Sequence, residues 1–167
     1  MLDESSLCVN KLNTPWTLWI HLPHDTNWDI NSYKKICTFN YLEQACGLLN
    51  YIQENLVVNC MLFIMRDDIK PIWEDEKNKN GGCYSYKINN KAVYNIWKTM
   101  TLLMVSEYIL NEPDVQKNIN GITVSPKKNF CIIKLWFNSG VTKTTNITIN
   151  KNIKELENYE GIYKQHI

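Results

Sequence analysis

Two tryptophans stand in segments of the sequence that otherwise have the composition of loops. Trp28 lies in the segment 23–29, among Pro, His, Asp, Thr and Asn, and Trp73 lies in the charged stretch 67–82. A polar loop does not readily bury an indole, and exposed loop aromatics are candidates for stacking on a flat ligand. The alternative, that both rings close the ends of the hydrophobic core, fits these two positions equally well.

A carboxylate, Glu74, directly follows Trp73. A carboxylate beside a stacking ring suits a flat ligand that presents adjacent N–H donors on one edge, as the N1–H and N2–H₂ groups of guanine do. A cationic ligand would also be attracted to the indole faces, an interaction worth about 2 kcal/mol or more once it is desolvated. The pattern therefore favours a binding site for a flat ring, and a positively charged one would bind best.

The elements that must position these residues are indicated by hydrophobic periodicity. Alternating, β-branched or aromatic runs predict strands at 16–22, 33–39, 59–66, 83–88, 118–124, 130–137 and 161–167. Helical spacing and capping residues predict helices at 41–55, with Asn40 as N-cap and Glu43 three residues on, and at 91–110 and 151–159. Strands dominate, so we expect an α+β fold with a largely antiparallel sheet.

The chain has the length of one domain, 167 residues. Residues 1–14 are polar without periodicity and are expected to form a flexible tail, which leaves 15–167 as a single domain. Trp16, Trp19 and Trp97 follow strand or helix periodicity and are expected in its core.

Composition excludes several classes of protein. Hydrophobic residues make up 44% and charged residues 21% of the chain, which are ordinary globular values. The net charge of +1 argues against a broad polyanion-binding surface. No apolar run approaches the ~20 residues of a membrane span, and the acidic, polar start is no secretory signal. Six cysteines without a C-x-x-C pair predict neither a zinc site nor a disulfide framework, so we expect a cytoplasmic protein without metal or cofactor.

Catalytic patterns are weak in this sequence. There is no glycine-rich phosphate loop and no nucleophile signature. The acidic stretch could in principle hold Mg²⁺ in an enzyme that acts on nucleotides, and its carboxylates are Asp67, Asp68, Glu74, Asp75 and Glu76. A solvated loop, balanced by neighbouring lysines, is the favoured interpretation.

The segment 69–82, Ile-Lys-Pro-Ile-Trp-Glu-Asp-Glu-Lys-Asn-Lys-Asn-Gly-Gly, strongly resembles the signature of the eukaryotic translation initiation factor 4E family, which binds the 7-methylguanosine cap of mRNA. The resemblance extends over about 10–167. Its further markers, in family order, are Trp16-x-x-Trp19, Trp28, the Trp97 helix with Leu102-Leu103 and Glu107, and Ile133-Lys134-Leu135-Trp136.

The resemblance implies a curved antiparallel sheet, with three helices on its convex face and the cap held in the concave front. Trp28 and Trp73 match the two stacking tryptophans, Glu74 the carboxylate that pairs with the guanine edge, and Trp136 the tryptophan against the N7-methyl group. Because methylation makes the base cationic, two indoles and an anionic Glu74 all favour the methylated form.

The phosphate side departs from the family pattern. Cys83 stands where the family usually has an arginine, and the next phosphate-binding arginine aligns with Lys127, which lacks the guanidinium fork. Lys128 or Lys134 could compensate. Fewer phosphate contacts predict a shallower salt dependence of cap binding than in a typical member.

The partner side departs more. In the family, a tryptophan on the first helix docks the helical motif of the scaffold factor 4G and of repressors, and here that position is Cys46. Leu42, Glu43 and Leu102 match other parts of that surface.

The resemblance implies a non-enzymatic, monomeric factor that recruits capped mRNA for translation initiation through a scaffold of the 4G type or a divergent equivalent. The first alternative is a cap-sequestering repressor without conventional scaffold binding. A metal-dependent enzyme on capped or nucleotide substrates is the least favoured.

Overall fold

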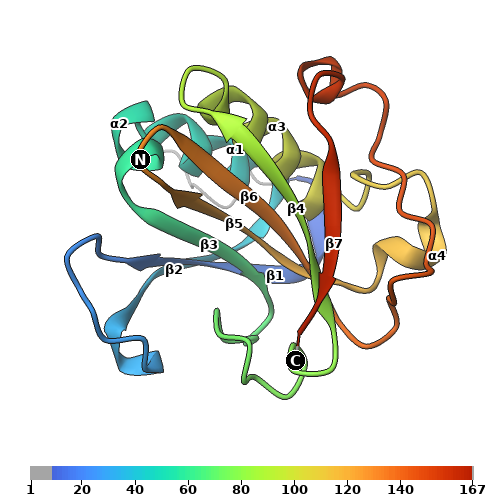
Figure 1. The fold of residues 1–167 in the computed structure, drawn as a ribbon, viewed down its shortest axis with the longest axis horizontal. Coiled ribbons are helices and arrows are strands. Elements are labelled where there is room, and N and C mark those ends of the chain that lie inside the picture. The colour runs from blue at the N-terminus through green and yellow to red at the C-terminus, as the bar shows by residue number, and fades with distance from the viewer. Residues whose placement is uncertain (1–8, 167) are drawn as a thin grey trace.

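The computed structural model describes residues 9–166, and Figure 1 shows the chain with its elements labelled. The strands are β1 (Lys11–His21), β2 (Tyr33–Tyr41), β3 (Met61–Arg66), β4 (Gly82–Asn89), β5 (Ile119–Pro126), β6 (Phe130–Phe137) and β7 (Gly161–Gln165). The α-helices are α1 (Leu42–Tyr51), α2 (Glu54–Asn59), α3 (Val93–Val105) and α4 (Pro113–Gln116), and short 3₁₀ turns lie at Ile30–Ser32 and Lys154–Leu156.

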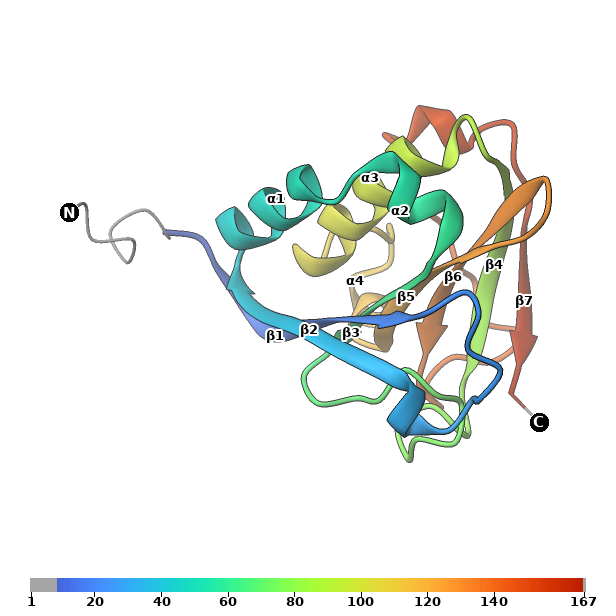
Figure 2. The same cartoon turned by 90° about the vertical axis from the view of Figure 1, so that its left-hand side faces the viewer.

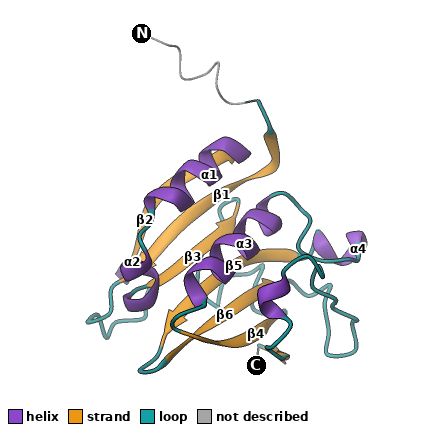
Figure 3. Cartoon of the chain, turned by 90° about the horizontal axis from the view of Figure 1, so that it is seen from above, coloured by secondary structure: helices purple, strands orange, loops and turns teal. Residues whose placement is uncertain are grey.

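The seven strands form one sheet in the order β2-β1-β3-β5-β6-β4-β7, and every neighbouring pair is antiparallel. Seen edge-on, the sheet is curved, and α1, α2 and α3 lie on its convex side (Figure 2). From above, these helices cross over the strands, whereas the short α4 lies at the side (Figure 3). The expected fold class, a curved antiparallel sheet with helices on its convex face, is confirmed, but one of the three predicted helices, that over 151–159, is only the 3₁₀ turn Lys154–Leu156.

Alternation along each strand divides the apolar residues between two faces. On β6, Ile133, Leu135 and Phe137 are fully buried in the main core under the helices. Trp136 belongs instead to a smaller cluster on the concave face. The sheet therefore carries the core on one side and leaves the other for a site.

The region predicted as one helix over 41–55 is two helices. Ile52 is buried and has extended backbone angles, which end α1, and the hydroxyl of Tyr94 donates to its carbonyl at 2.9 Å. The capping prediction was also wrong, because Gln44 rather than Glu43 closes the start of α1. Its side-chain oxygen accepts from the N–H groups of Asn40 and Tyr41 at 2.9 and 3.2 Å.

The predicted tail over 1–14 needs a correction. β1 begins at Lys11, so residues 11–14 belong to the sheet. The apolar Leu12 is buried in the core, and the carboxylate of Glu43 accepts from the backbone and side-chain amides of Asn10. One buried leucine in a polar segment produces no periodicity, which explains the error. Residues 1–8 lie outside the described part of the chain. No helix of the described residues is long and apolar enough to cross a membrane.

Arg66, the only arginine of the sequence, is the last residue of β3 and connects this strand to the segment that follows α3. Its guanidinium pairs with both carboxylate oxygens of Glu107 at 2.6 and 3.2 Å, and Nε donates to the carbonyl of Ile119 at 2.8 Å. The guanidinium carbon also lies 4.4 Å from the centre of the Trp16 ring. The two charged side chains are only 12% and 17% exposed, so each depends on the other for solvation.

We expect Arg66→Met to lower the free energy of unfolding by about 3 kcal/mol, because it leaves the Glu107 carboxylate largely buried without its partner. Urea unfolding followed by tryptophan fluorescence measures the change. Lys79→Met is the matched control. Its pair with Glu76, at 2.7 Å, is solvent-exposed, and its loss is expected to cost less than about 0.5 kcal/mol. Equal losses in the two variants would contradict the role given to Arg66.

Candidate functional site

The concave face carries a small hydrophobic cluster of its own, in which Phe63, Met65, Ile69, Cys83 and Trp136 are buried. Trp136 is only 8% exposed, and its Nε1–H donates to the Thr123 hydroxyl at 2.8 Å. That bond fixes the orientation of the indole. The cluster forms a rigid floor between two loops at one end of the sheet.

Trp28 stands on the β1–β2 loop with 57% of its surface exposed. One face of its ring stacks on the buried His21, with ring centres 4.2 Å apart and planes within 4°. Nε2 of His21 lies 2.8 Å from the Asn27 carbonyl, and Tyr33 contacts the imidazole with its edge. The indole is thus supported from one side and leaves its other face available to a ligand.

Trp73 stands on the β3–β4 loop and is 50% exposed. The loop is organised by its own polar side chains. The carboxylate of Asp75 accepts from the N–H groups of Lys70 and Lys77 at 3.0 and 2.9 Å. The buried Asn78 donates to the carbonyls of Lys70 and Ile72 at 3.0 and 2.8 Å. Sequence reasoning missed this supporting role of Asp75 and Asn78.

Asn120 of β5 anchors the same loop to the sheet. Its side-chain amide donates to the Asn78 side-chain oxygen at 2.9 Å and to the Lys77 carbonyl at 2.8 Å. A loop held through two buried asparagines has little freedom to move. Trp73 is therefore held in place before any ligand arrives.

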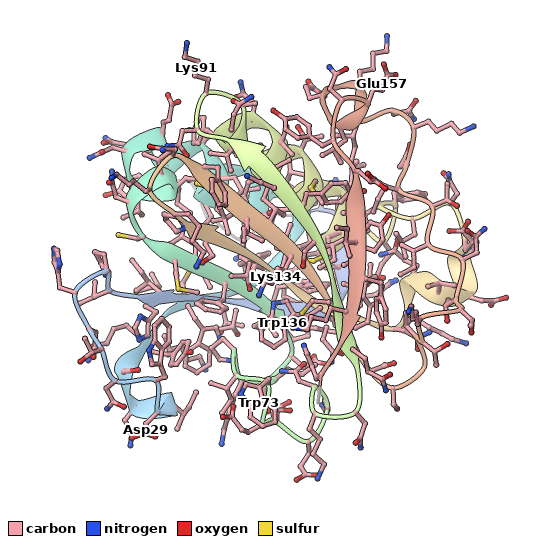
Figure 4. The ribbon with its side chains drawn as sticks, in the orientation of Figure 1. Asp29, Trp73, Lys91, Lys134, Trp136 and Glu157 are labelled. Carbon is pink, nitrogen blue, oxygen red and sulfur yellow. The ribbon has the colours of Figure 1, made fainter. Side chains whose placement is uncertain are left out.

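One electrostatic interaction links the two loops, although the pocket at Trp73 is lined by neither Trp28 nor Glu74. The pKa of Tyr33, which packs against the His21 that supports Trp28, is raised by burial and also by the negative charge of Glu74. The Glu74 carboxylate is therefore within electrostatic range of Tyr33 at the start of β2. Among the described residues Glu74 has no ion-pair partner. In Figure 4, Trp73 lies below Trp136 and Asp29, the neighbour of Trp28, lies to one side.

A pocket of about 370 Å³ lies beside Trp73, and two lysines in its lining make it positively charged. Its lining residues are Trp73, Cys83, Ser85, Lys134, Trp136, Lys164, Gln165 and His166. Lys134 was expected there, whereas Lys164 and His166 were not. They arrive because β7 pairs with β4, with Lys164 opposite Cys83. Pairing between strands about 80 residues apart in the chain leaves no local signal in the sequence.

Cys83 and His166 form a hydrogen-bonded pair at the wall of this pocket. Nδ1 of His166 lies 2.8 Å from the Asn78 carbonyl and must donate to it, which leaves Nε2 as the acceptor in the neutral ring. The Cys83 sulfur lies 3.2 Å from Nε2 and donates. Burial raises the pKa of the Cys83 thiol to about 12, although Lys134 opposes the shift. The thiol is therefore neutral at physiological pH, and it does not offset the positive charges of Lys134 and Lys164.

A profile of the family described as Eukaryotic initiation factor 4E matches residues 11–166. The chain belongs to this family. It is 29% identical over 145 residues to the eukaryotic translation initiation factor 4E homolog of Acanthamoeba polyphaga mimivirus, covering 74% of this chain and 53% of the relative. It is 28% identical over 155 residues to initiation factor 4E-1 of Schizosaccharomyces pombe, covering 89% and 70%. The chain thus spans about half the length of the viral relative.

Solved structures agree with this assignment. Caenorhabditis elegans eIF4E-3, in complex with the 4E-binding protein Mextli and a cap analog, superposes with a TM-score of 0.68 at 25% identity, covering 77% of this chain and 74% of that one. Schistosome eIF4E, complexed with m7GpppG and 4E-BP, gives a TM-score of 0.75 at 17% identity and covers 93% and 88%. At 17% identity, the similarity to the schistosome structure shows that the two proteins share a fold.

The structure of this chain does not bring Lys127 and Lys128 to the pocket. Both lie in the β5–β6 turn and line a separate hollow of about 710 Å³ beside α2. Six residues of extended chain, roughly 20 Å, separate Lys128 from Lys134. The expectation that Lys127 leads the phosphate contacts is therefore not supported by its position, whereas the position of Lys134 supports its own assignment.

The residues that were expected to bind partners lie on α1 and α3, which pack side by side on the convex face. Leu42, Glu43 and Cys46 lie on α1 and Leu102 on α3, and all four are partly exposed. Glu43 is already engaged by the amides of Asn10. The structure thus brings the four expected residues onto one face of the molecule, opposite the pocket.

The acidic stretch is not arranged as a metal site. Asp75 accepts from backbone N–H groups, Asp68 lies 3.4 Å from Lys77 and Glu76 lies 2.7 Å from Lys79. Within residues 9–166 no three His, Cys, Asp or Glu side chains gather as metal ligands would. These contacts balance the charge of Asp68, Asp75 and Glu76 without a cation.

Proposed function

We propose that this chain binds the 7-methylguanosine cap of mRNA in the concave pocket and catalyses no reaction. One observation carries the proposal: two half-exposed indoles, Trp28 and Trp73, stand on neighbouring rigid loops beside a carboxylate, Glu74, for which the described chain offers no ion-pair partner. A free carboxylate and two aromatic faces make a site for a flat cation with donors on one edge.

The cap base fulfils each of these requirements. The methylated guanine is cationic and stacks between Trp28 and Trp73, while N1–H and N2–H₂ donate to Glu74 and the Trp73 backbone N–H donates to O6. Trp136, held by Thr123, lies against the N7-methyl group. Unmethylated guanine lacks the positive charge, so it loses most of the cation–π attraction and part of the attraction to Glu74.

The cap phosphates extend toward Lys134 and Lys164, which are the cationic donors of the pocket. His166 also lines the pocket, and its ring accepts a hydrogen bond from Cys83. Lysines bind phosphate as point charges and lack the paired donors of arginine. With two lysines in place of the arginines of the family pattern, the salt dependence of cap binding should be shallow.

In the cell, we propose a cytoplasmic role in translation initiation, in which the convex face docks a scaffold factor of the 4G type or a divergent equivalent. The protein is then a monomer outside its complex. Support comes from the two structural neighbours, each of which was solved with a binding protein. Cys46 lacks the aromatic anchor on which helix-in-groove docking depends, so a cap-sequestering repressor remains the second candidate.

Trp73→Ala and Trp28→Ala should each weaken binding of 7-methyl-GTP by about 5- to 150-fold, because each removes one stacking face worth ~1–3 kcal/mol. Tryptophan fluorescence titration measures the change. For the wild type we expect strong quenching by 7-methyl-GTP and weak quenching by GTP, with no effect of EDTA and no turnover of the nucleotide. Tyr51→Ala, which removes an exposed ring on α1, is the matched control and should bind normally.

Two results of this titration would overturn the proposal. One is equal binding of 7-methyl-GTP and GTP by the wild type. The other is nucleotide hydrolysis that EDTA abolishes, which would favour the metal-dependent enzyme.

Glu74→Gln should weaken binding of 7-methyl-GTP by about tenfold or more, because a hydrogen bond to a charged group contributes about 1.5–3 kcal/mol. It should also reduce the preference for 7-methyl-GTP over GTP, since the cationic base loses its counter-charge. Glu76→Gln on the same loop is the control, as Glu76 pairs with Lys79. A similar loss in both variants would assign the effect to the charge of the loop and not to Glu74.

Cys46→Trp should increase the affinity for a peptide that spans the 4E-binding segment of Mextli, because it restores the aromatic anchor on α1; we expect about tenfold or more. Gly47→Trp on the same helix, where a side chain meets open space, should change nothing. Calorimetry with the peptide measures both, and cap affinity should stay unchanged. Wild-type binding as tight as that of Cys46→Trp would show that the anchor is not needed here.

A further inference from the structure

A row of lysines leads away from the pocket along the sheet. The strands β5, β6, β4 and β7 lie side by side and contain Lys87, Lys134 and Lys164 but no Asp or Glu. Lys134 and Lys164 line the pocket. Lys87 lies on the same face of β4 as Cys83 and Ser85, by the alternation of the strand. In a chain whose net charge is only +1, this half of the sheet is a local concentration of positive charge.

The row continues to the upper edge of the sheet. The Lys87 ammonium lies 4.3 Å from the centre of the Phe130 ring, at the first residue of β6. The preceding turn carries Lys127 and Lys128, which share a hollow with Lys91 beyond the end of β4. Glu54 is the single acidic residue among those lining this hollow. In Figure 4, Trp73, Trp136, Lys134 and Lys91 follow one another from the lower to the upper edge.

We infer that the RNA nucleotides that follow a bound cap run along β6 toward the β5–β6 turn, where Lys91, Lys127 and Lys128 bind their phosphates. The inference rests on the proposed cap binding and extends it. It gives a role to Lys127 and Lys128, which the pocket itself does not use.

The direction follows from charge and position. With the base between Trp28 and Trp73 and its phosphates at Lys134, the chain already points up the sheet. The opposite direction leads to the stretch 67–82, which has five acidic residues against three lysines. Lys134 and the turn lie roughly 20 Å apart along β6, a distance that a few extended nucleotides span. Phe130, at the end of β6 next to the turn, has Lys87 over one face of its ring and offers the other for a base to stack on.

Single-stranded RNA fits this surface better than an acidic protein segment does. The lysines follow one line that begins at the phosphate end of the pocket, and a polyanion already tethered there by its cap needs only weak further contacts. Such contacts add to the salt dependence by about 0.7 in the slope of log K against log salt for each phosphate neutralised on a single strand.

The test compares three ligands at several salt concentrations: 7-methyl-GTP, a single-stranded RNA of ten nucleotides carrying the 7-methylguanosine cap, and the same RNA without it. The variant replaces Lys91, Lys127 and Lys128 with Ala. We expect the wild type to bind the capped RNA several-fold more tightly than 7-methyl-GTP, with a slope steeper by about 2. The variant should bind 7-methyl-GTP like the wild type and lose the extra affinity and the extra slope.

A second triple variant, with Lys117, Lys143 and Lys151 replaced by Ala, controls for net charge. These lysines are exposed and lie in the region from α4 to the loop after β6. It should keep the full gain for capped RNA. If both triple variants lose the extra affinity for capped RNA equally, the effect comes from the net charge of the protein, and the inference is overturned.

The remaining outcomes separate the two proposals. If the wild type binds 7-methyl-GTP but gains nothing from the attached RNA, the path along β6 is wrong and cap binding stands. If 7-methyl-GTP itself does not bind, both fail. If a hexaglutamate peptide displaces the capped RNA at equimolar concentration, the lysines serve an acidic protein segment instead, and the inference is overturned.

Discussion

The alternation of side chains across one curved sheet is the constraint on which the rest of the structure depends. On β6, Leu135 and Phe137 are buried under the helices, and this fixes Lys134 and Trp136 on the opposite face. A shift of one residue in the register of β6 would point Lys134 into the core and would move Trp136 away from the pocket. The convex core therefore sets the position of the concave site, although the two share no side chain. The Arg66–Glu107 pair reinforces this by joining β3 to the end of α3.

The two loop tryptophans are supported by stacking and hydrogen bonds within the protein that do not need a ligand. His21 supports the Trp28 ring, and Asp75 and Asn78 hold the loop of Trp73. A loop that must be ordered on binding costs affinity, so a pre-formed site retains more of the stacking energy. The signature segment therefore has two kinds of residue. Trp73 and Glu74 are the residues that we propose contact the ligand, while Asp75 and Asn78 organise the loop that carries them.

Sequence patterns predicted most of this fold, and they failed where the deciding contact is non-local. The strand at 130–137 was predicted with its observed bounds, because all of its residues except Lys134 are apolar. Trp28 and Trp73 were singled out because an indole in a polar loop is conspicuous, and the structure shows both exposed on their loops. Lys164 and His166 were missed because only the pairing of β7 with β4 brings them to the pocket. Lys127 was expected to lead the phosphate contacts, but the β5–β6 turn that carries it lines a separate hollow and not the pocket.

The near-zero net charge of the chain conceals a separation of charge that the proposed ligand requires. A cationic base needs an anionic partner, and the phosphates attached to it need cations a short distance away. The fold meets both demands by placing carboxylates on the β3–β4 loop and by keeping every acidic residue out of strands β4 to β7. Adding lysines near Trp73 would raise the attraction for phosphate and weaken the attraction for the methylated base. The sign of the charge at each end of the pocket, and not its total, therefore decides which ligand fits.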